Sequence, residues 1–448
     1  MAGYIPQCES HLCRLIDAAS ETGGAFWPSV LDVRTGRYPE RDHVPRRVYR
    51  LIGAPRGSTL YWDQPMIAAA NALSELTGNP KYSRAADRYL EAFLSRCVAE
   101  NGMFRWGNHA YFDLSRKTVV DFHRGHHELR PIVPAWDCFW RLAPERTAAY
   151  IRTMARRHLF DPASGGFNRH DDGKQGHAFL EAGGILCESL AWLYGKTGDG
   201  DLLDTALRIA RYSYRHRDPV TGLVPNEPNM GRWDSKVCTS EIGLWAQSLL
   251  RAGRYSANPE FDEMAGNAVR AYLEWAFDDR TGRVFGQVGV RDGKPVVPEK
   301  PGYWPRQYAD PWNTDQWPTH DYPMALAKAC LSLYRTTADR AFRDAIEHCA
   351  AMAVRGCPGR TGSWAYAESY GHCIHFLALA GLELGDERFT ADARLLAAEA
   401  MDTLLENGMF QGYADSHVYE AVDGVGCLLL ALMALEHPHA IGTSGLEF

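Results

Sequence analysis

The sequence predicts an all-α protein in the form of a single closed α/α toroid of about seven helical hairpins. Two repeats in the 448 residues support this prediction: paired amphipathic segments, and a polar turn with glycine that recurs between the pairs. Both repeats extend from one end of the sequence to the other. We therefore expect one domain that spans residues 1–448.

The paired segments have the apolar spacing of amphipathic helices. Their apolar residues recur every three or four positions, which places them on one face of a helix. A short break separates the two halves of each segment, so each predicts a helix, a tight turn and a returning helix. The clearest pairs are residues 71–94, 189–214, 330–350 and 377–401.

The recurring turns predict short β-hairpin loops at one mouth of the toroid. Asp or Asn close to Gly favours a turn, and the residues after it are typical of a short strand. We expect Asp161, Asp218 and Asp278 to shape such turns and not to act as catalysts. The copies are residues 32–40, 100–109, 161–170, 218–227, 278–287, 359–368 and 406–415.

Each turn leads into a helix that is more apolar than its partner, and we expect these inner helices to line the toroid. The helix near residues 5–20 has no preceding partner and the last helix has no following one, so their pairing would close the ring. The N-termini of the inner helices carry partial positive charge and would favour an anionic ligand. The inner helices are expected to begin near residues 62, 127, 177, 235, 319, 368 and 418.

Composition excludes several classes of protein. The formal charge of −7 and the lack of a Lys/Arg run argue against a nucleic-acid partner. No apolar segment approaches the roughly 20 residues that a membrane span needs. The 11 cysteines form no CxxC pair and are expected to be buried thiols. Without a signal-peptide pattern at its start, the chain is expected in the cytoplasm, or in the periplasm or medium if a leader was removed.

The polar loops are rich in His, Tyr, Trp, Asn and Arg. Aromatic faces stack on sugar rings, while amides, carboxylates and guanidinium groups bind hydroxyls, and cationic groups bind a sugar carboxylate. We therefore expect an acidic glycan or oligosaccharide as the substrate of a monomer or homodimer. No cofactor or metal is expected, because His126, His127 and Glu128 lack a second pair of ligands at zinc spacing.

The segments WDQPMIAAANALSELTGNPKY (62–82) and LYGKTGD (193–199) resemble the helix pairs of unsaturated-glucuronyl hydrolases and toroidal polysaccharide lyases. A ring of seven hairpins is similar in particular to glucuronan-type lyases with an (α/α)7 barrel. The resemblance covers nearly the whole chain as architecture and implies a carbohydrate-active enzyme. It does not match the catalytic residues of these families to particular residues of this sequence.

Chemistry ranks the reactions that such an enzyme performs. β-Elimination of a uronate needs a group that neutralises the carboxylate, a base and an acid, and families that do this without metal use Asn, Arg, His and Tyr. The excess of His and Tyr favours such a lyase. The candidate catalytic residues are His109, His170, Tyr366, His372 and Tyr413. The candidate substrate-binding residues are Asp63, Trp106, Asn108, Asn168, Asp171, Glu181, Arg232, Trp233, Tyr308 and His417.

Three alternatives stay open. A glycoside hydrolase would use two opposed carboxylates. The candidates for these are Asp63, Asp171, Glu181, Asp234, Asp321 and Asp423. A sugar epimerase would transfer protons with a pair such as His170 and His372. A scaffold that binds glycans without catalysis would present the same concave surface. Glu181 and Glu188 lie on one helical stripe, either facing the cavity or paired within the wall.

Overall fold

The computed structural model describes residues 3–21, 24–39, 56–106, 110–122, 126–129, 132–229, 234–278, 280–297, 306–312 and 322–438. The chain divides into two compact units. The first unit comprises residues 1–125, 137–142 and 353–446, and the second comprises residues 126–136, 143–352 and 447–448. The expectation of one domain over residues 1–448 stays a prediction.

Helices dominate the first unit, and short strands connect them. The helices are α1 (Ile5–Glu21), α2 (Leu60–Thr77), α3 (Lys81–Arg96), α4 (Trp136–Leu142, which begins at the unit boundary), α12 (Pro358–Thr361), α13 (Ala367–Leu384), α14 (Glu387–Leu404), α15 (Val425–Glu436) and the 3-10 turn η1 (Ala421–Asp423). The strands are β1 (Val30–Asp32), β2 (Gly57–Ser58), β3 (Ala110–Asp113), β4 (Thr118–Asp121), β11 (Leu405–Glu406), β12 (Met409–Phe410) and β13 (Val418–Glu420). Helix α15 packs against α2 and α13.

The two ends of the described chain meet inside the first unit. The Tyr4 backbone N–H donates to Glu436 Oε1 at 2.6 Å, and α1 packs against α15. Strand β1 pairs antiparallel with β13, with Val30 opposite Glu420. The predicted pairing of the first and last helices is therefore confirmed.

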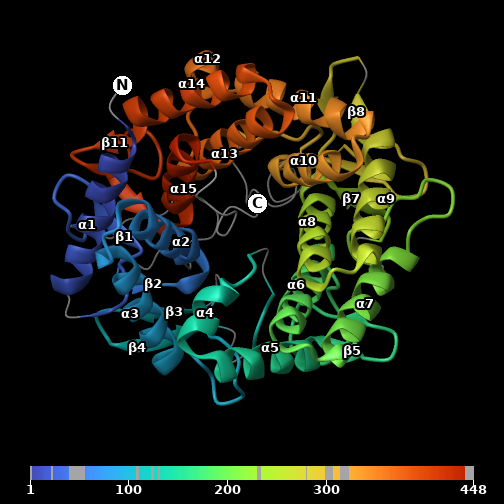
Figure 1. Cartoon of the computed structure of the whole chain (residues 1–448), viewed down its shortest axis with the longest axis horizontal. Coiled ribbons are helices and arrows are strands. Elements are labelled where there is room, and N and C mark those ends of the chain that lie inside the picture. Colours follow the sequence, from blue (N-terminus) through green and yellow to red (C-terminus); the bar gives the residue numbers. More distant parts are fainter. Residues whose placement is uncertain are drawn as a thin grey trace. The chain divides into compact units, whose positions relative to one another are not determined.

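The second unit stacks its helices in two layers. It contains α5 (Pro144–His158), α6 (Leu180–Thr197), α7 (Gly200–Arg215), α8 (Thr239–Ser256), α9 (Pro259–Ala276), α10 (Met324–Thr337) and α11 (Arg340–Arg355, whose last residues belong to the first unit). Its strands are β5 (Leu159–Asp161), β6 (Gly166–Phe167), β7 (Lys236–Cys238), β8 (Phe277–Asp278), β9 (Arg283–Val284) and β10 (Gln287–Gly289). Figure 1 shows α6 and α8 in one layer and α7 and α9 in the next, in agreement with their contacts.

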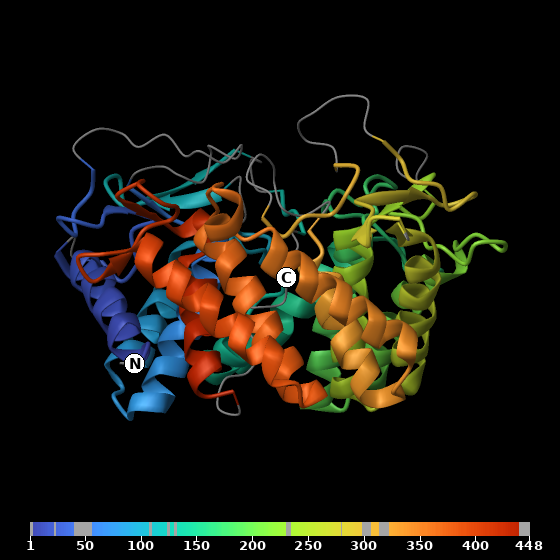
Figure 2. The ribbon, with the colours of Figure 1, turned by 90° about the horizontal axis from the view of Figure 1, so that it is seen from above.

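Burial separates the inner helices from the outer ones, as the sequence predicts. Nearly every residue of α6 between Leu180 and Leu193 is buried, whereas α7 buries one stripe and exposes the other. The strands of the second unit lie at one end of its helices (Figure 2). Strands β6 and β7 precede the N-termini of α6 and α8, so the loops at this end are brought together by the packing of α6 on α8.

The aspartate turns are confirmed. Asp161 Oδ1 accepts from the backbone N–H of Ala163, Asp218 Oδ1 from that of Val220, and Asp278 Oδ1 from that of Arg280. The predicted strand after the turn is present in β6, β9 and β12. These hydrogen bonds hold each carboxylate in its own turn, and they help to lower the pKa of all three groups.

Two predicted helix starts are wrong. The helix expected near residue 127 begins as α4 at Trp136, because Pro134 lacks an N–H donor and disfavours helical geometry at Val133. The helix expected near residue 418 begins as α15 at Val425, because residues 418–420 pair with β1 instead. The starts of α2, α6, α8, α10 and α13 lie within five residues of their predicted positions.

All 11 cysteines are free thiols and nearly all are buried, as predicted. No helix within the described residues is long and apolar enough to cross a membrane.

Candidate functional site

A polar cluster gathers where the second unit's loops meet the N-termini of α6 and α8. Its frame is an antiparallel ladder between residues 127–129 and 169–171. The Leu129 N–H donates to the Arg169 carbonyl at 2.8 Å, and the Asp171 N–H donates to the His127 carbonyl at 3.1 Å. Glu128 and His170 face each other across this ladder. The ladder therefore presents Glu128, Arg169 and His170 together.

Arg169 is the central cation of the cluster. Its Nη2 donates to Glu128 Oε1 at 2.5 Å, and its guanidinium lies over the Phe179 ring at 5.0 Å from the ring centre. Its positive charge partly opposes the rise that burial causes in the pKa of Glu241. The planar guanidinium matches a carboxylate in shape and charge, so Arg169 has the chemistry needed to bind a uronate.

Two histidines flank this arginine and keep part of their rings exposed. His170 Nε2 lies 3.6 Å from Glu128 Oε1, and its ring centre lies 5.7 Å from that of His177. His177 Nδ1 lies 3.0 Å from Oε1 of the buried Glu227, which orients the ring. The side chains of His170 and His177 are 31% and 45% exposed. Both imidazoles are therefore accessible for proton transfer to a ligand.

A carboxyl pair forms the inner edge of the cluster. Glu181 stands in the first turn of α6 and Glu241 in the first turn of α8, and both are buried. The Glu181 N–H lies 3.5 Å from Glu241 Oε2. Burial, the charge of Glu181 and a hydrogen bond with its carboxyl raise the pKa of Glu241 well above its usual range. The protonated form of Glu241 is therefore favoured relative to that of an exposed glutamate.

Glu188, the other acidic residue of this stripe, belongs to the wall. Its two oxygens accept from Arg251 Nε and Nη2 at 2.6 and 2.7 Å, and both side chains are buried. Glu188 therefore has the paired-wall role that the sequence left open.

Asn168 and Asp171 hold the loop in shape. Asn168 Nδ2 donates to Asp172 Oδ1 at 2.9 Å and to the Lys174 carbonyl at 3.0 Å. Asp171 accepts from the His127 N–H and from Arg157 Nε, both at 2.9 Å. Both side chains are buried, so contact of either with substrate stays a prediction.

Tyr308 lies on another hairpin of the second unit. Its hydroxyl donates to Asp278 Oδ2 at 2.7 Å, and its ring stacks on Phe285 with centres 5.3 Å apart. The Arg283 guanidinium lies over the same ring at 4.1 Å. These contacts tie Tyr308 to the turn after β8, and none of them reaches the cluster around Arg169.

The first unit holds the remaining described candidates. Tyr366 and Tyr413 form a β-bridge with ring centres 5.9 Å apart, and both rings contact Trp364. His372 is buried one turn after Glu368 on α13. Trp106 packs edge-on against Tyr61, with ring centres 5.7 Å apart.

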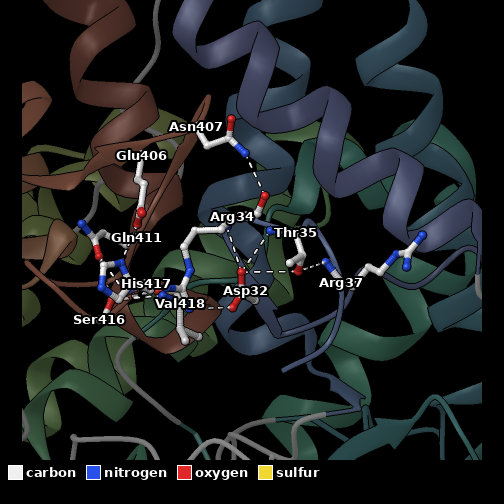
Figure 3. A network of polar contacts seen from close by, with 10 residues as sticks. All are labelled: Asp32, Arg34, Thr35, Arg37, Glu406, Asn407, Gln411, Ser416, His417 and Val418. Carbon is white, nitrogen blue, oxygen red and sulfur yellow. Dashed lines mark hydrogen bonds and ion pairs between the residues drawn. The ribbon is translucent and has the colours of Figure 1, made fainter. Parts of the chain in front are cut away.

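His417 and Asp63 make polar contacts of their own. Figure 3 shows His417 beside Glu406, with His417 Nδ1 2.7 Å from Glu406 Oε2. The His417 N–H donates to Gln411 Oε1 at 2.8 Å, in the neighbourhood of the turn that Asp32 shapes. Asp63 is completely buried and accepts from the Tyr89 hydroxyl at 2.6 Å. Their roles in binding stay predictions.

The other predicted site residues, Asn108, His109, Arg232 and Trp233, lie outside the described residues. Among the described residues, no group of three His, Cys, Asp or Glu side chains forms a metal site. Glu128 and His170 are two side chains of the cluster with the ligand chemistry of a divalent cation.

Comparisons with known proteins connect the chain to carbohydrate-active enzymes. Residues 58–182 match the family described as periplasmic pectate lyase. A pectate disaccharide-lyase of Dickeya dadantii is 30% identical over 110 residues, which make up 22% of this chain and 19% of that enzyme. The matched family segment includes Arg169, His170, His177 and Glu181.

Solved structures show the fold. A GH76 α-mannanase of Bacteroides thetaiotaomicron aligns with a TM-score of 0.53 at 10% identity, over 98% of this chain and 96% of that one. A cellobiose 2-epimerase of Bacillus thermoamylovorans aligns with a TM-score of 0.52 at 10% identity, over 96% and 97%. Both are α/α-toroid enzymes, so the predicted fold class is confirmed. The number of hairpins stays a prediction.

Sequence reasoning passed over four residues of the cluster: Arg169, His177, Glu227 and Glu241. A signal for Glu241 was present, since it shares with Glu181 an acidic position in the first turn of an apolar inner helix. Arg169 lies inside the polar stretch 168–177, but nothing local distinguishes it from the residues beside it.

Proposed function

We propose that this protein is a polysaccharide lyase that cleaves a uronate-containing glycan by β-elimination. The observation that carries the proposal is the cluster at the N-termini of α6 and α8, in which Arg169 and the partly exposed His170 share Glu128 and the partly exposed His177 lies beside His170. The match of residues 58–182 to a pectate lyase family supports it, and makes pectate the first substrate to test.

The reaction has three chemical requirements, and the cluster supplies a residue for each. Arg169 binds the uronate carboxylate and stabilises the negative charge that develops when the neighbouring C5 proton is removed. His170 accepts this proton. His177, oriented by Glu227, donates a proton to the glycosidic oxygen as the C4–O bond breaks and the C4–C5 double bond forms.

Hydrolysis is the second candidate, because Glu181 and Glu241 are a carboxyl pair. Retaining hydrolases separate their two carboxyl groups by about 5 Å and inverting enzymes by more, to leave room for the sugar or a water. Glu181 and Glu241 are both buried, and the Glu181 N–H lies 3.5 Å from Glu241 Oε2. The side chains of His170 and His177 are the more exposed groups, which supports elimination as the first candidate.

An activity panel separates the reactions. Purified protein is incubated with pectate, glucuronan, alginate and neutral mannan, with and without added divalent cations or chelator. Ultraviolet absorbance of an unsaturated uronate product supports the lyase. Release of reducing ends without this absorbance supports a hydrolase, and no product from any glycan contradicts both.

Substitution of Arg169 tests the assignment of the carboxylate-binding group. Arg169→Ala is expected to lower kcat/KM on a uronate glycan by about 100-fold or more, since one charge-stabilising donor is worth that much. Arg169→Lys retains the charge but not the planar guanidinium, and its kcat/KM is expected to lie between those of the wild type and Arg169→Ala. Arg211→Ala is the matched control, because Arg211 pairs with Glu260 at the surface of the same unit. Activity of Arg169→Ala equal to that of the control would remove Arg169 from the site.

A further inference from the structure

A chain of buried side chains runs behind the loop that carries Arg169 and His170. His158 Nδ1 lies 2.8 Å from the Asn168 carbonyl oxygen, and His158 Nε2 lies 2.8 Å from His127 Nδ1. His127 Nε2 in turn lies 2.9 Å from the Tyr150 hydroxyl. All three side chains are buried.

We call this series of hydrogen bonds from Asn168 to Tyr150 the relay. The direction of each bond in it follows from the Asn168 carbonyl, its first acceptor. A carbonyl oxygen only accepts, so His158 Nδ1 carries the hydrogen and donates to Asn168. A neutral imidazole has one N–H, so His158 Nε2 accepts from His127 Nδ1, and His127 Nε2 accepts from the Tyr150 hydroxyl. Both rings are neutral, because burial lowers the pKa of His158 to about 4 and that of His127 well below its usual range.

This relay holds both strands of the ladder that forms the site. His158 binds Asn168 twice, through its ring and through its carbonyl, which accepts from the Asn168 N–H at 2.8 Å. His127 is itself the first residue of the opposite strand, and its N–H donates to Asp171 Oδ1. One buried hydrogen bond between two imidazoles therefore connects the strand of Glu128 to the strand of Arg169 and His170.

We propose that His158 and His127 are positioning residues that set the register of Arg169 and His170 against Glu128. Neither ring belongs to the exposed part of the cluster, so both act through the residues that they hold. The expected effect on turnover rests on the proposed function. A shift of about 1 Å in a reacting group can lower a rate by about 100-fold, so a relay that fixes the ladder would act mainly on kcat.

Two substitutions of His158 separate its two hydrogen bonds. Asn places its amide near the position of Nδ1, so His158→Asn can still donate to the Asn168 carbonyl but loses the bond to His127. Gln places its amide near Nε2, so His158→Gln keeps a partner for His127 and releases Asn168. We expect both variants to lower kcat by about tenfold or more with a smaller change in KM, His158→Asn because the bond between the two strands is lost and His158→Gln because the Asn168 carbonyl loses its ring donor.

The matched control is His11→Gln on α1 in the other unit. His11 is equally buried and accepts from the Phe410 N–H at 3.1 Å through Nδ1. Its replacement is expected to lower thermal stability as the His158 variants do, with kcat unchanged. Equal kcat for His158→Gln, His158→Asn and His11→Gln would overturn the positioning role.

A spectroscopic measurement tests the relay without any activity. Long-range 1H–15N spectra of the wild-type protein with labelled histidine should show His127 and His158 as neutral Nδ1–H tautomers, identified by the signals that each single variant lacks. Nε2–H tautomers at both rings would overturn the inference. If no uronate glycan is cleaved while both Nδ1–H tautomers are found, the proposed function fails and the relay stands.

Discussion

Asp63 allows a quantitative test of how burial acts on a single carboxyl group. It lies in the first turn of α2 and is completely inaccessible to solvent. Burial raises its pKa from the ordinary 3.8 to about 7, against the opposing effect of hydrogen bonds from Tyr89 and Ser58. The neutral acid is therefore the form that the folded protein prefers.

The sign and size of the pH effect follow from this pKa. Asp63 binds its proton more tightly in the folded chain than in the unfolded chain, so its contribution to stability is fully present below pH 3.8 and is lost as the pH rises to about 7. One pKa unit corresponds to about 1.4 kcal/mol, which makes the whole loss about 4 kcal/mol and the loss between about pH 5 and 7 about 2 kcal/mol, since the group is half ionised near pH 7.

The assay compares the wild type with Asp63→Asn, which has the shape of the protonated acid and does not titrate. Urea unfolding is measured from about pH 5 to 8, and other titrating groups cancel in the difference between the two proteins. We expect the wild type to lose stability relative to Asp63→Asn as the pH rises. Asp161→Asn is the control, because hydrogen bonds with Ser164 lower the pKa of Asp161 from 3.8, so its contribution changes only at lower pH and the difference should stay flat across the measured range. A constant or rising difference for Asp63→Asn would refute the reasoning.

Two further predictions concern buried charges of the second unit. Arg251→Ala leaves the Glu188 carboxylate buried without its two hydrogen bonds and should lower the free energy of unfolding by about 3–5 kcal/mol in urea titrations. The double variant Glu188→Leu/Arg251→Met should recover most of this loss, and equal losses in both would contradict the charge argument. Glu241→Gln mimics the protonated Glu241, so the wild type should become less stable relative to it as the pH rises, as thermal unfolding would show. A relative gain of wild-type stability would contradict the raised pKa.

The helices were predictable because their signal is local. Apolar spacing and Gly breaks fix the starts of α6 and α8 to within a few residues, and the Asp turns fix the hairpins before them. The start of α4 was missed because the apolar pattern was given more weight than Pro134. The start of α15 was predicted too early because residues 418–420 form a strand that pairs with β1, almost 400 residues away in the sequence.

The site was less predictable, because it depends on register between distant strands. The ladder with residues 127–129 brings both Arg169 and His170 to Glu128. Asn168 instead donates to Asp172 and to the Lys174 carbonyl of its own loop. The sequence identified Asn168, His170 and Asp171 as candidates, but only the pairing of two segments about 40 residues apart decides which residues meet Glu128.

Acidic side chains at the N-termini of the inner helices change how an anionic ligand can be bound. The inner helices were expected to attract an anionic ligand through their dipoles. Four of them instead carry a buried acid in the first turn: Asp63, Glu181, Glu241 and Glu368. These carboxyl groups already occupy the positions at the helix N-termini that an anionic ligand would take. The helix dipoles therefore interact with the protein's own acidic side chains. Recognition of a uronate carboxylate then depends on a side-chain cation, and Arg169 is the cation that the ladder holds beside two histidines.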